Sequence, residues 1–288
     1  MKIVKRSFFT LLVLASAATA LWSLDNDSER LAIPFSDPGK PGLVKANLIN
    51  GGIVVKGYEG KEVIIETKPR SHVVGADEDE AEAEDEDEKP DKHAGMKRLQ
   101  GSGGGLNVEE SNNVIAIDMP PWKTDNDLFI QVPMNVSLEL ETVNNGNITV
   151  ENVNGDIEAS NVNGAIILTR IGGAVVAETV NGDVKVAFTR LDGKKPLSLI
   201  SLNGDIDITL PATAKANVKM KIDNHGEIYS DFELALQNKT EKTVEDKRGH
   251  GGHYRLRIDR AMFGTINGGG QEITLKTFNG DILLRKSK

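Results

Sequence analysis

The residues best placed to do chemistry are aspartates that recur directly after glycines. Asp156, Asp183, Asp205 and Asp281 each follow a glycine, and Asp207 lies two residues beyond Asp205, on the same face of an extended strand. Two carboxylates held at a defined separation are the working groups of glycoside hydrolases. If consecutive repeats stack, Asp183 and Asp205 become neighbours. No Arg or Lys recurs at the same position of the repeat, so a carbohydrate-active lyase or hydrolase remains an alternative and not the leading hypothesis.

Glycine-containing nonapeptides with a recurring aspartate also occur in calcium-binding β-rolls. Calcium takes about six to eight oxygen ligands. In this sequence Asn147, Ala165 and Ala174 interrupt the aspartate series, so the repeats supply too few carboxylates. We therefore expect no bound calcium.

Histidines give only a weak indication of a metal site. His250 and His253 are separated by two glycines with no carboxylate between them, and His225 stands apart. We interpret residues 247–254 as a flexible polar turn. The sequence also contains no cysteine, no phosphate-binding loop and no Gly-x-Ser-x-Gly nucleophile motif. We expect no catalytic residue, no cofactor and no metal, and hence no enzyme.

The glycines belong to a nonapeptide repeat. They stand at positions 146, 155, 164, 173 and 182, and four of the five follow an asparagine. Apolar residues recur at fixed distances from each glycine, which predicts short strands with one apolar face. Two residues after the glycines lie Ile148, Ile157, Ile166, Val175 and Val184, four residues after them lie Val150, Ala159, Leu168, Ala177 and Val186, and two residues before most of them lie Val153, Val162, Ile171 and Val180. Within this pattern Ile157 should point inward and Glu158 outward.

The constant repeat length favours one all-β fold over another. A coil that stacks on itself requires equal repeats, because each strand lies over its equivalent one coil away. A meander or sandwich built from hairpins uses the same Asn-Gly turns without that requirement, and it stays open as the alternative. The sequence therefore predicts an all-β chain, a β-solenoid in which each coil holds either two nonapeptides or one longer unit, of the length that separates Gly182 from Gly204.

Asparagine and glycine are interpreted as the corners of this solenoid. Glycine adopts positive φ at little cost and asparagine tolerates it. Asn145, Asn163, Asn181 and Asn203 would then lie above one another and hydrogen-bond along a ladder. The predicted structural turns are Asn145, Gly146, Asn154, Gly155, Asn163, Gly164, Gly173, Asn181, Gly182, Asn203, Gly204, Asn267, Gly268, Asn279 and Gly280.

The segments outside the repeat suggest export. Residues 1–20 combine a basic start, an apolar run and a small-residue end, which predicts a signal peptide cleaved after Ala20, with an uncleaved anchor as the alternative. No later stretch is apolar enough to span a membrane. We expect a polar leader over 21–42 and a β-solenoid domain over 43–288.

An acidic insert interrupts that domain. Residues at about 68–105 lose the strand pattern, and residues 77–88 hold ten acids and no base, which predicts a disordered loop. Without this block the chain has 34 basic and 33 acidic residues. That balance argues against a nucleic-acid partner.

Three stretches carry a resemblance to a known family. The VNGDI units, the segment LPATAKANVKMKIDNHGEIYSDF (210–232) and the closing GTINGGGQEITLKTFNGDILLRK (264–286) resemble the bacterial putative-adhesin families of exported β-strand-repeat proteins. The resemblance covers about residues 43–286 and implies a right-handed β-helix-like fold on the cell envelope or outside it. The family has no established catalytic residues to carry over, and the acidic insert departs from its usual pattern.

The leading hypothesis is a non-enzymatic exported protein whose faces act as a binding or scaffolding surface for an envelope glycan or protein. Outward residues such as Glu158, Thr169, Glu178 and Lys185 would make the contacts. The protein would stay in the periplasm, sit on the outer cell surface or be secreted. A further alternative is an envelope signalling accessory protein whose acidic block, residues 77–88, docks a basic partner.

Overall fold

A computed structural model describes residues 30–69, 106–119, 126–144, 146–191, 193, 195–237, 241–247, 253–259 and 261–288. The expected signal peptide, nearly all of the acidic insert, Asn145 and His250 lie outside the described residues.

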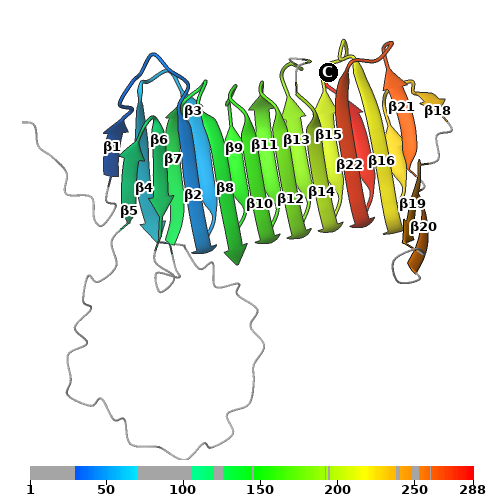
Figure 1. The fold of residues 1–288 in the computed structure, drawn as a ribbon. Helices are drawn as coiled ribbons and strands as arrows, with labels where there is room; N and C mark the ends of the chain where they lie inside the picture. The colour runs from blue at the N-terminus through cyan, green and yellow to red at the C-terminus, as the bar shows by residue number, and fades with distance from the viewer. Residues whose placement is uncertain are drawn as a thin grey trace, which may run out of the picture.

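The described residues form strands and no helix, as the sequence predicts (Figure 1). Two large sheets contain almost all of the strands. Sheet A consists, in spatial order, of β1 (Arg30–Pro34), β4 (Glu62–Pro69), β7 (Asn126–Pro133), β3 (Ile53–Tyr58), β9 (Ile148–Glu151), β11 (Ile166–Ile171), β13 (Val184–Phe188), β15 (Ile206–Leu210), β23 (Ile282–Lys286) and β17 (Ile228–Ser230). Sheet B consists of β18 (Ala235–Gln237), β21 (Met262–Ile266), β16 (Ala216–His225), β22 (Gln271–Asn279), β14 (Leu197–Asn203), β12 (Val175–Asn181), β10 (Ile157–Asn163), β8 (Ser137–Asn144), β2 (Leu43–Asn50), β6 (Val114–Asp118) and β5 (Asn107–Ser111).

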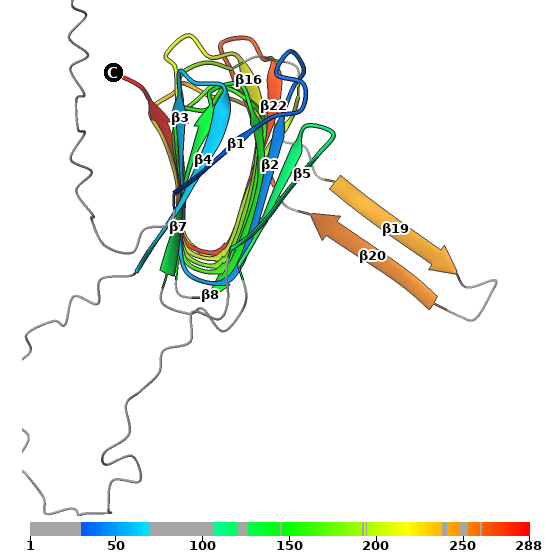
Figure 2. The ribbon, with the colours of Figure 1, turned by 90° about the vertical axis from the view of Figure 1, so that its left-hand side faces the viewer.

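The two sheets face each other and the chain passes between them once per nonapeptide (Figure 2). Ile148 pairs with Ile166, and Ile166 pairs with Val184, so each of these steps is two nonapeptides long. The next step, from Val184 to Ile206, is longer. These pairings are parallel, whereas the strands of a meander are antiparallel. The repeats therefore stack as a β-solenoid-like coil of two nonapeptides, with one longer coil.

The last coils do not stack in chain order. After β14 and β15 the next places in the two sheets are taken by β22 and β23, and only then by β16 and β17. Ile206 accordingly pairs with Ile282, and Ile282 also pairs with Ile228. The chain skips one place, makes an excursion through β18, β19 (Glu241–Lys247), β20 (His253–Asp259) and β21, and then fills the gap. The β19–β20 hairpin extends away from the two sheets (Figure 2).

Antiparallel strands close one end of both sheets and the other end of sheet B, whereas sheet A ends there in the parallel strand β17. β1, β4 and β7 pair antiparallel at one end of sheet A, and β5 pairs antiparallel with β6 at the same end of sheet B. At the other end β21 runs antiparallel to both β16 and β18. β1 falls within residues 21–42, where the sequence suggests only a polar leader. Such capping strands cover the open ends of a solenoid, which would otherwise template association with another chain.

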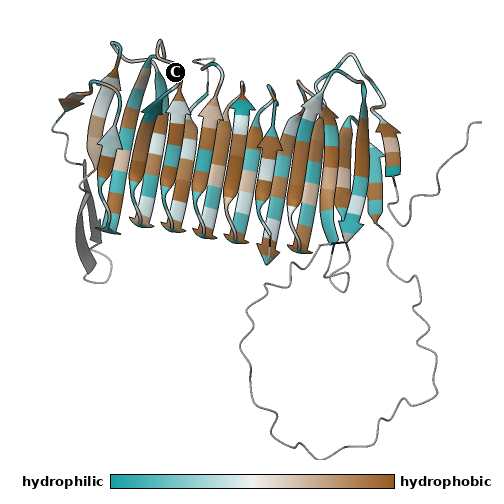
Figure 3. Cartoon of the chain, turned by 180° about the vertical axis from the view of Figure 1, so that it is seen from behind, coloured by the Kyte–Doolittle hydropathy of each residue, from teal (hydrophilic) through white to brown (hydrophobic). Residues whose placement is uncertain are grey.

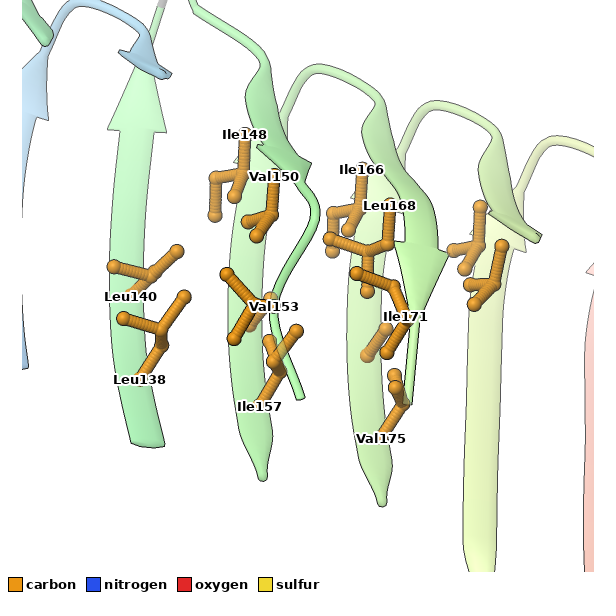
Figure 4. Close-up of a cluster of buried hydrophobic side chains, with 14 of the residues drawn as sticks. Leu138, Leu140, Ile148, Val150, Val153, Ile157, Ile166, Leu168, Ile171 and Val175 are labelled. Atoms are coloured by element: carbon orange, nitrogen blue, oxygen red, sulfur yellow. The ribbon is translucent and has the colours of Figure 1, made fainter. Parts of the chain in front are cut away.

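The core lies between the sheets and consists of the inward-facing aliphatic side chains. Leu138, Leu140, Ile157 and Val175 of sheet B meet Ile148, Val150, Ile166 and Leu168 of sheet A in successive layers (Figure 4). Hydrophobic and hydrophilic residues alternate in bands along the strands (Figure 3). The predicted orientation of β10 is confirmed, because Ile157 is buried and Glu158 is exposed.

One part of the predicted apolar face is wrong. Val153 and Ile171, two residues before their glycines, are buried, but Val162 and Val180, at the same position of the neighbouring nonapeptides, are exposed. Positive φ at the residue before Val153 (Asn152, 62°) breaks the alternation there and turns the valine inward. Along β10 and β12 the alternation runs unbroken to the corner, so the valine points out.

Candidate functional site

The corner between β10 and β11, and its equivalents in the other coils, carries three columns of polar groups. In the first, an asparagine side chain of each coil donates its amide to the amide oxygen of the coil before. Asn163 donates to Asn144 (3.1 Å), Asn181 to Asn163 (2.9 Å) and Asn203 to Asn181 (3.0 Å), and beyond them Asn279 donates to Asn203 (2.8 Å) and Asn224 to Asn279 (2.7 Å). The bonds join Asn163, Asn181 and Asn203 as the sequence suggests, and the residue below Asn163 is Asn144. We call this column the asparagine ladder.

The second column consists of the glycines that follow the asparagines. A Cβ on Gly164 would lie 2.1 Å from the carbonyl oxygen of Gly146, and a Cβ on Gly204 would lie 2.2 Å from that of Gly182. Gly280 meets Gly204 in the same way. Because the backbones approach this closely, a side chain at any of these positions would force the coils apart.

The third column faces inward and satisfies the glycine carbonyls. Thr179 donates its hydroxyl to Gly164 (2.9 Å), and Ser201 donates to Gly182 (2.9 Å). In β10 the equivalent residue is Asn161, which donates its amide to Gly146 (2.9 Å). Among the described residues Asn161 Oδ1 is the one buried side-chain oxygen or nitrogen without a hydrogen-bond partner.

The aspartates after the glycines hold the next coil by its backbone. Asp183 accepts a hydrogen bond from the N–H of Asp205 (3.0 Å), and Asp205 accepts one from the N–H of Asp281 (2.8 Å). Burial opposes ionisation of Asp183, but hydrogen bonds from Lys185 and from the Asp205 N–H outweigh it and lower the pKa of the Asp183 carboxyl. The carboxylates considered for catalysis are thus neighbours across one coil, and both are engaged in coil-to-coil bonds.

Basic partners for two of these aspartates exist in the structure, although no Arg or Lys recurs at the same position of the repeat. Arg285 donates its Nε to both carboxylate oxygens of Asp207 (2.8 and 2.9 Å), and Lys185 forms an ion pair with Asp183 (3.0 Å). The sequence hides the Asp207–Arg285 pair because Arg285 belongs to the coil that returns from the excursion. The lowered pKa of Asp183 beside Lys185 favours its ionised form, which does not provide the protonated acid that a glycosidase needs.

The remaining predicted turns lie away from this corner. Asn154, Gly155 and Gly173 lie at the opposite corner, between β9 and β10 and between β11 and β12. Asn267 and Gly268 form the turn between β21 and β22, where both have positive φ (47° and 86°) and Asn267 donates its side-chain amide to the carbonyl of Ala214.

The predicted contact residues lie on two different faces. Glu158 and Glu178 point outward from sheet B, whereas Thr169 and Lys185 belong to sheet A. No group of three or more potential metal ligands occurs among the described residues, and His225 is exposed at the end of β16.

The outer surface of sheet B carries a feature that the sequence interpretation missed. We define the sheet-B face as the outward side chains of β2, β8, β10, β12, β14, β22 and β16. Six apolar residues, 36% to 45% exposed, stand beside the asparagine ladder at the same position of successive strands. This apolar ladder consists of Ile49, Val143, Val162, Val180, Leu202 and Phe278. The unbroken alternation from Ile157 to Val162 would have revealed it.

Charge is divided along the same face. The two columns next to the apolar ladder carry Glu139, Glu141, Glu158 and Glu178 on β8, β10 and β12, with Lys45 bound to Glu139. On β22 and β16 the same two columns carry Lys219, Lys221 and Lys276 and no acid. Asp223 and Glu272 border this basic end, and Asp223 forms ion pairs with Lys221 and Lys276.

The comparison with family models agrees with the resemblance seen in the sequence. The family described as Toastrack DUF4097 matches residues 137–285, more than half of the chain. Among solved structures the chain is similar to the crystal structure of a putative cell adhesion protein from Clostridium sporogenes ATCC 15579, with 13% identity and a TM-score of 0.43 over 91% of this chain and 99% of that one. No curated protein matches it. Among the described residues there is no helix long and apolar enough to cross a membrane. With a family match that spans most of the stacked coils, this chain belongs to the Toastrack DUF4097 family.

Proposed function

We propose that the protein is a non-enzymatic, adhesin-like component of the cell envelope that works through a binding or scaffolding surface. It is exported, with its signal peptide cleaved near Ala20, and its coils are right-handed. The asparagine-glycine corners serve the stacking of the coils and hold no ligand.

The observation that carries this proposal is the apolar ladder. Adjacent strands lie about 4.8 Å apart, so six consecutive rungs form a stripe roughly 24 Å long. Isolated exposed aliphatic residues are common on soluble proteins, but a continuous apolar stripe with a polar border marks an interaction surface. The asparagine ladder borders the stripe on one side, and on the other side lie the two columns that are charged or polar apart from Val176 and Ile200.

The ladder is also a surface that the fold does not need. The inward positions of the same strands already form the core, and the coils are joined by backbone pairing and by the three polar columns. Polar residues at these outward positions would therefore support the stacking of the coils about as well as valine, leucine and phenylalanine do. Contact with a partner gives these side chains a role.

The test is co-sedimentation of the purified exported chain with isolated envelope fractions. Leu202 is 45% exposed on the apolar ladder, and Leu31 is 42% exposed on β1, away from it, so the two leucines form a matched pair. We expect Leu202→Asp to reduce saturable binding by at least about tenfold, as loss of a central interface side chain does. Leu31→Asp should leave binding unchanged. Equal binding by both variants would remove the sheet-B face from consideration.

The same experiment addresses the two alternatives. Release of sugar from the envelope fraction, abolished by Asp183→Ala or Asp205→Ala, would make the protein a carbohydrate-active enzyme. Loss of binding on deletion of residues 77–88, with no effect of Leu202→Asp, would point to the acidic block and a basic partner.

A further inference from the structure

We propose that the sheet-B face binds a second copy of this chain, with the two stacks face to face and their coil order reversed. This inference rests on the proposed function, because it names the partner of the same surface.

The first argument is the position of the apolar ladder. It does not run along the middle of the face but along one side, beside the asparagine ladder. Two identical faces bring their ladders together only if the strands of both copies run in the same direction. If one copy were turned so that its strands ran oppositely, the ladder of each copy would meet the charged columns of the other.

The second argument is the charge division along the stack. Glutamates dominate β8, β10 and β12, and lysines occupy β22 and β16. If the coils of two copies ran in the same order, glutamate would face glutamate. Reversed order places the acidic end of each copy over the basic end of the other.

These two arguments select the same symmetry. Two identical sheets can pack face to face about a twofold axis that lies between them, either along the strands or along the stack. The axis along the strands keeps the strand direction and reverses the coil order, so it matches apolar to apolar and acid to base at once. The axis along the stack does neither. With the first axis near β12 and β14, β8 of one copy lies over β22 and β16 of the other, and Glu141 faces Lys276 and Lys221.

The face is large enough for a stable dimer. Seven strands spaced about 4.8 Å apart span roughly 30 Å, and seven residues at about 3.3 Å each give a width of roughly 23 Å. The resulting face of about 700 Å² is close to the roughly 800 Å² per partner of a standard interface. Sheets that pack in this way lie with their strands nearly aligned, which the selected axis allows.

The experiment is analytical ultracentrifugation of the purified exported chain over a concentration series. We expect a monomer–dimer equilibrium that Leu202→Asp shifts to monomer and that Leu31→Asp leaves unchanged. Glu141→Lys and Lys276→Glu should each weaken the dimer roughly tenfold, because the symmetry repeats each like-charge contact twice. An equimolar mixture of these two variants should associate more tightly than either variant alone, because the lysine at position 141 of one copy then meets the glutamate at position 276 of the other.

Each outcome of these measurements either supports or overturns the proposed dimer. A monomeric parent chain overturns it, and so does a Glu141→Lys variant that associates more tightly than the parent, since that result belongs to the axis along the stack. A chain that stays monomeric yet still binds envelope through Leu202 refutes the self-association and leaves the proposed function standing. A chain that dimerises as described but binds no envelope fraction supports the self-association and removes the envelope ligand.

Discussion

Asn161 is the residue at which a single substitution should stabilise the protein. It lies in the inward polar column between Thr142 and Thr179, its register partners in the neighbouring coils. All three side chains donate to a glycine carbonyl, but asparagine also buries an amide oxygen that has no partner among the described residues. Asn161→Thr keeps the donor, removes the unpaired oxygen and places a β-branched residue in a strand.

The expected gain follows from the cost of the unpaired oxygen. A buried acceptor without a hydrogen bond costs about 1–3 kcal/mol, and part of this is recovered by local relaxation, so we expect about 1 kcal/mol of added stability. For a domain of this size that amounts to a rise in the thermal midpoint of about 2–4 °C. Urea unfolding followed by circular dichroism measures the free energy, and thermal unfolding measures the midpoint.

Asn161→Val is the matched control. It removes the unpaired oxygen as threonine does, but it also removes the donor to Gly146, so it should be less stable than Asn161→Thr by about 1 kcal/mol or more. If the threonine variant is destabilised as much as the valine variant, the inward column does not work through hydrogen bonds to the glycine carbonyls.

The remaining predictions concern the core, the corner and acid stability. Ile157→Asp should lower the free energy of unfolding by more than about 3 kcal/mol or prevent folding, because it buries an unpaired charge, while Glu158→Lys should change the urea midpoint very little. A result with the two effects exchanged would invert the inside and outside of β10. Gly204→Ala should lower the free energy of unfolding in urea by about 2–3 kcal/mol, because its Cβ would lie 2.2 Å from a backbone oxygen. An unchanged urea midpoint would show that neighbouring coils can move apart at this corner without loss of stability. The pKa of Asp183 is lowered in the folded state, so its stabilising contribution is present above its ordinary pKa of 3.8 and is lost as the pH falls through the folded value. The Asp183→Asn variant should therefore lose less free energy of unfolding, measured in urea, than the parent chain when the pH falls below 3.8. An equal loss in the variant and the parent chain would assign acid unfolding to other groups.

The repeat itself was predictable because it is local. The nonapeptide spacing, the alternation along each strand and the glycine at the corner are properties of consecutive residues. They favoured stacked coils over a meander, and the parallel register in steps of two nonapeptides agrees with that preference. Ile157 and Glu158 took the sides that the pattern indicates. The prediction for Val162 was wrong because it was made from the distance to the glycine and not from the alternation along the strand. A positive φ at Asn152 shifts the alternation before Val153, and no such φ precedes Val162.

What the sequence determined by itself was the kind of structure: short strands with one apolar face, joined by tight corners at the glycines. What only the tertiary structure decided was which coils are neighbours. β22 and β23 lie between coils that precede them in the chain, so Asp207 meets Arg285 although the two are far apart in the sequence. Strands far apart in the sequence pair where the rest of the fold leaves the edge of a sheet open. A local sequence pattern contains no information about which edge that is. For the same reason the divided charge of the sheet-B face became visible only once the strands were in their spatial order.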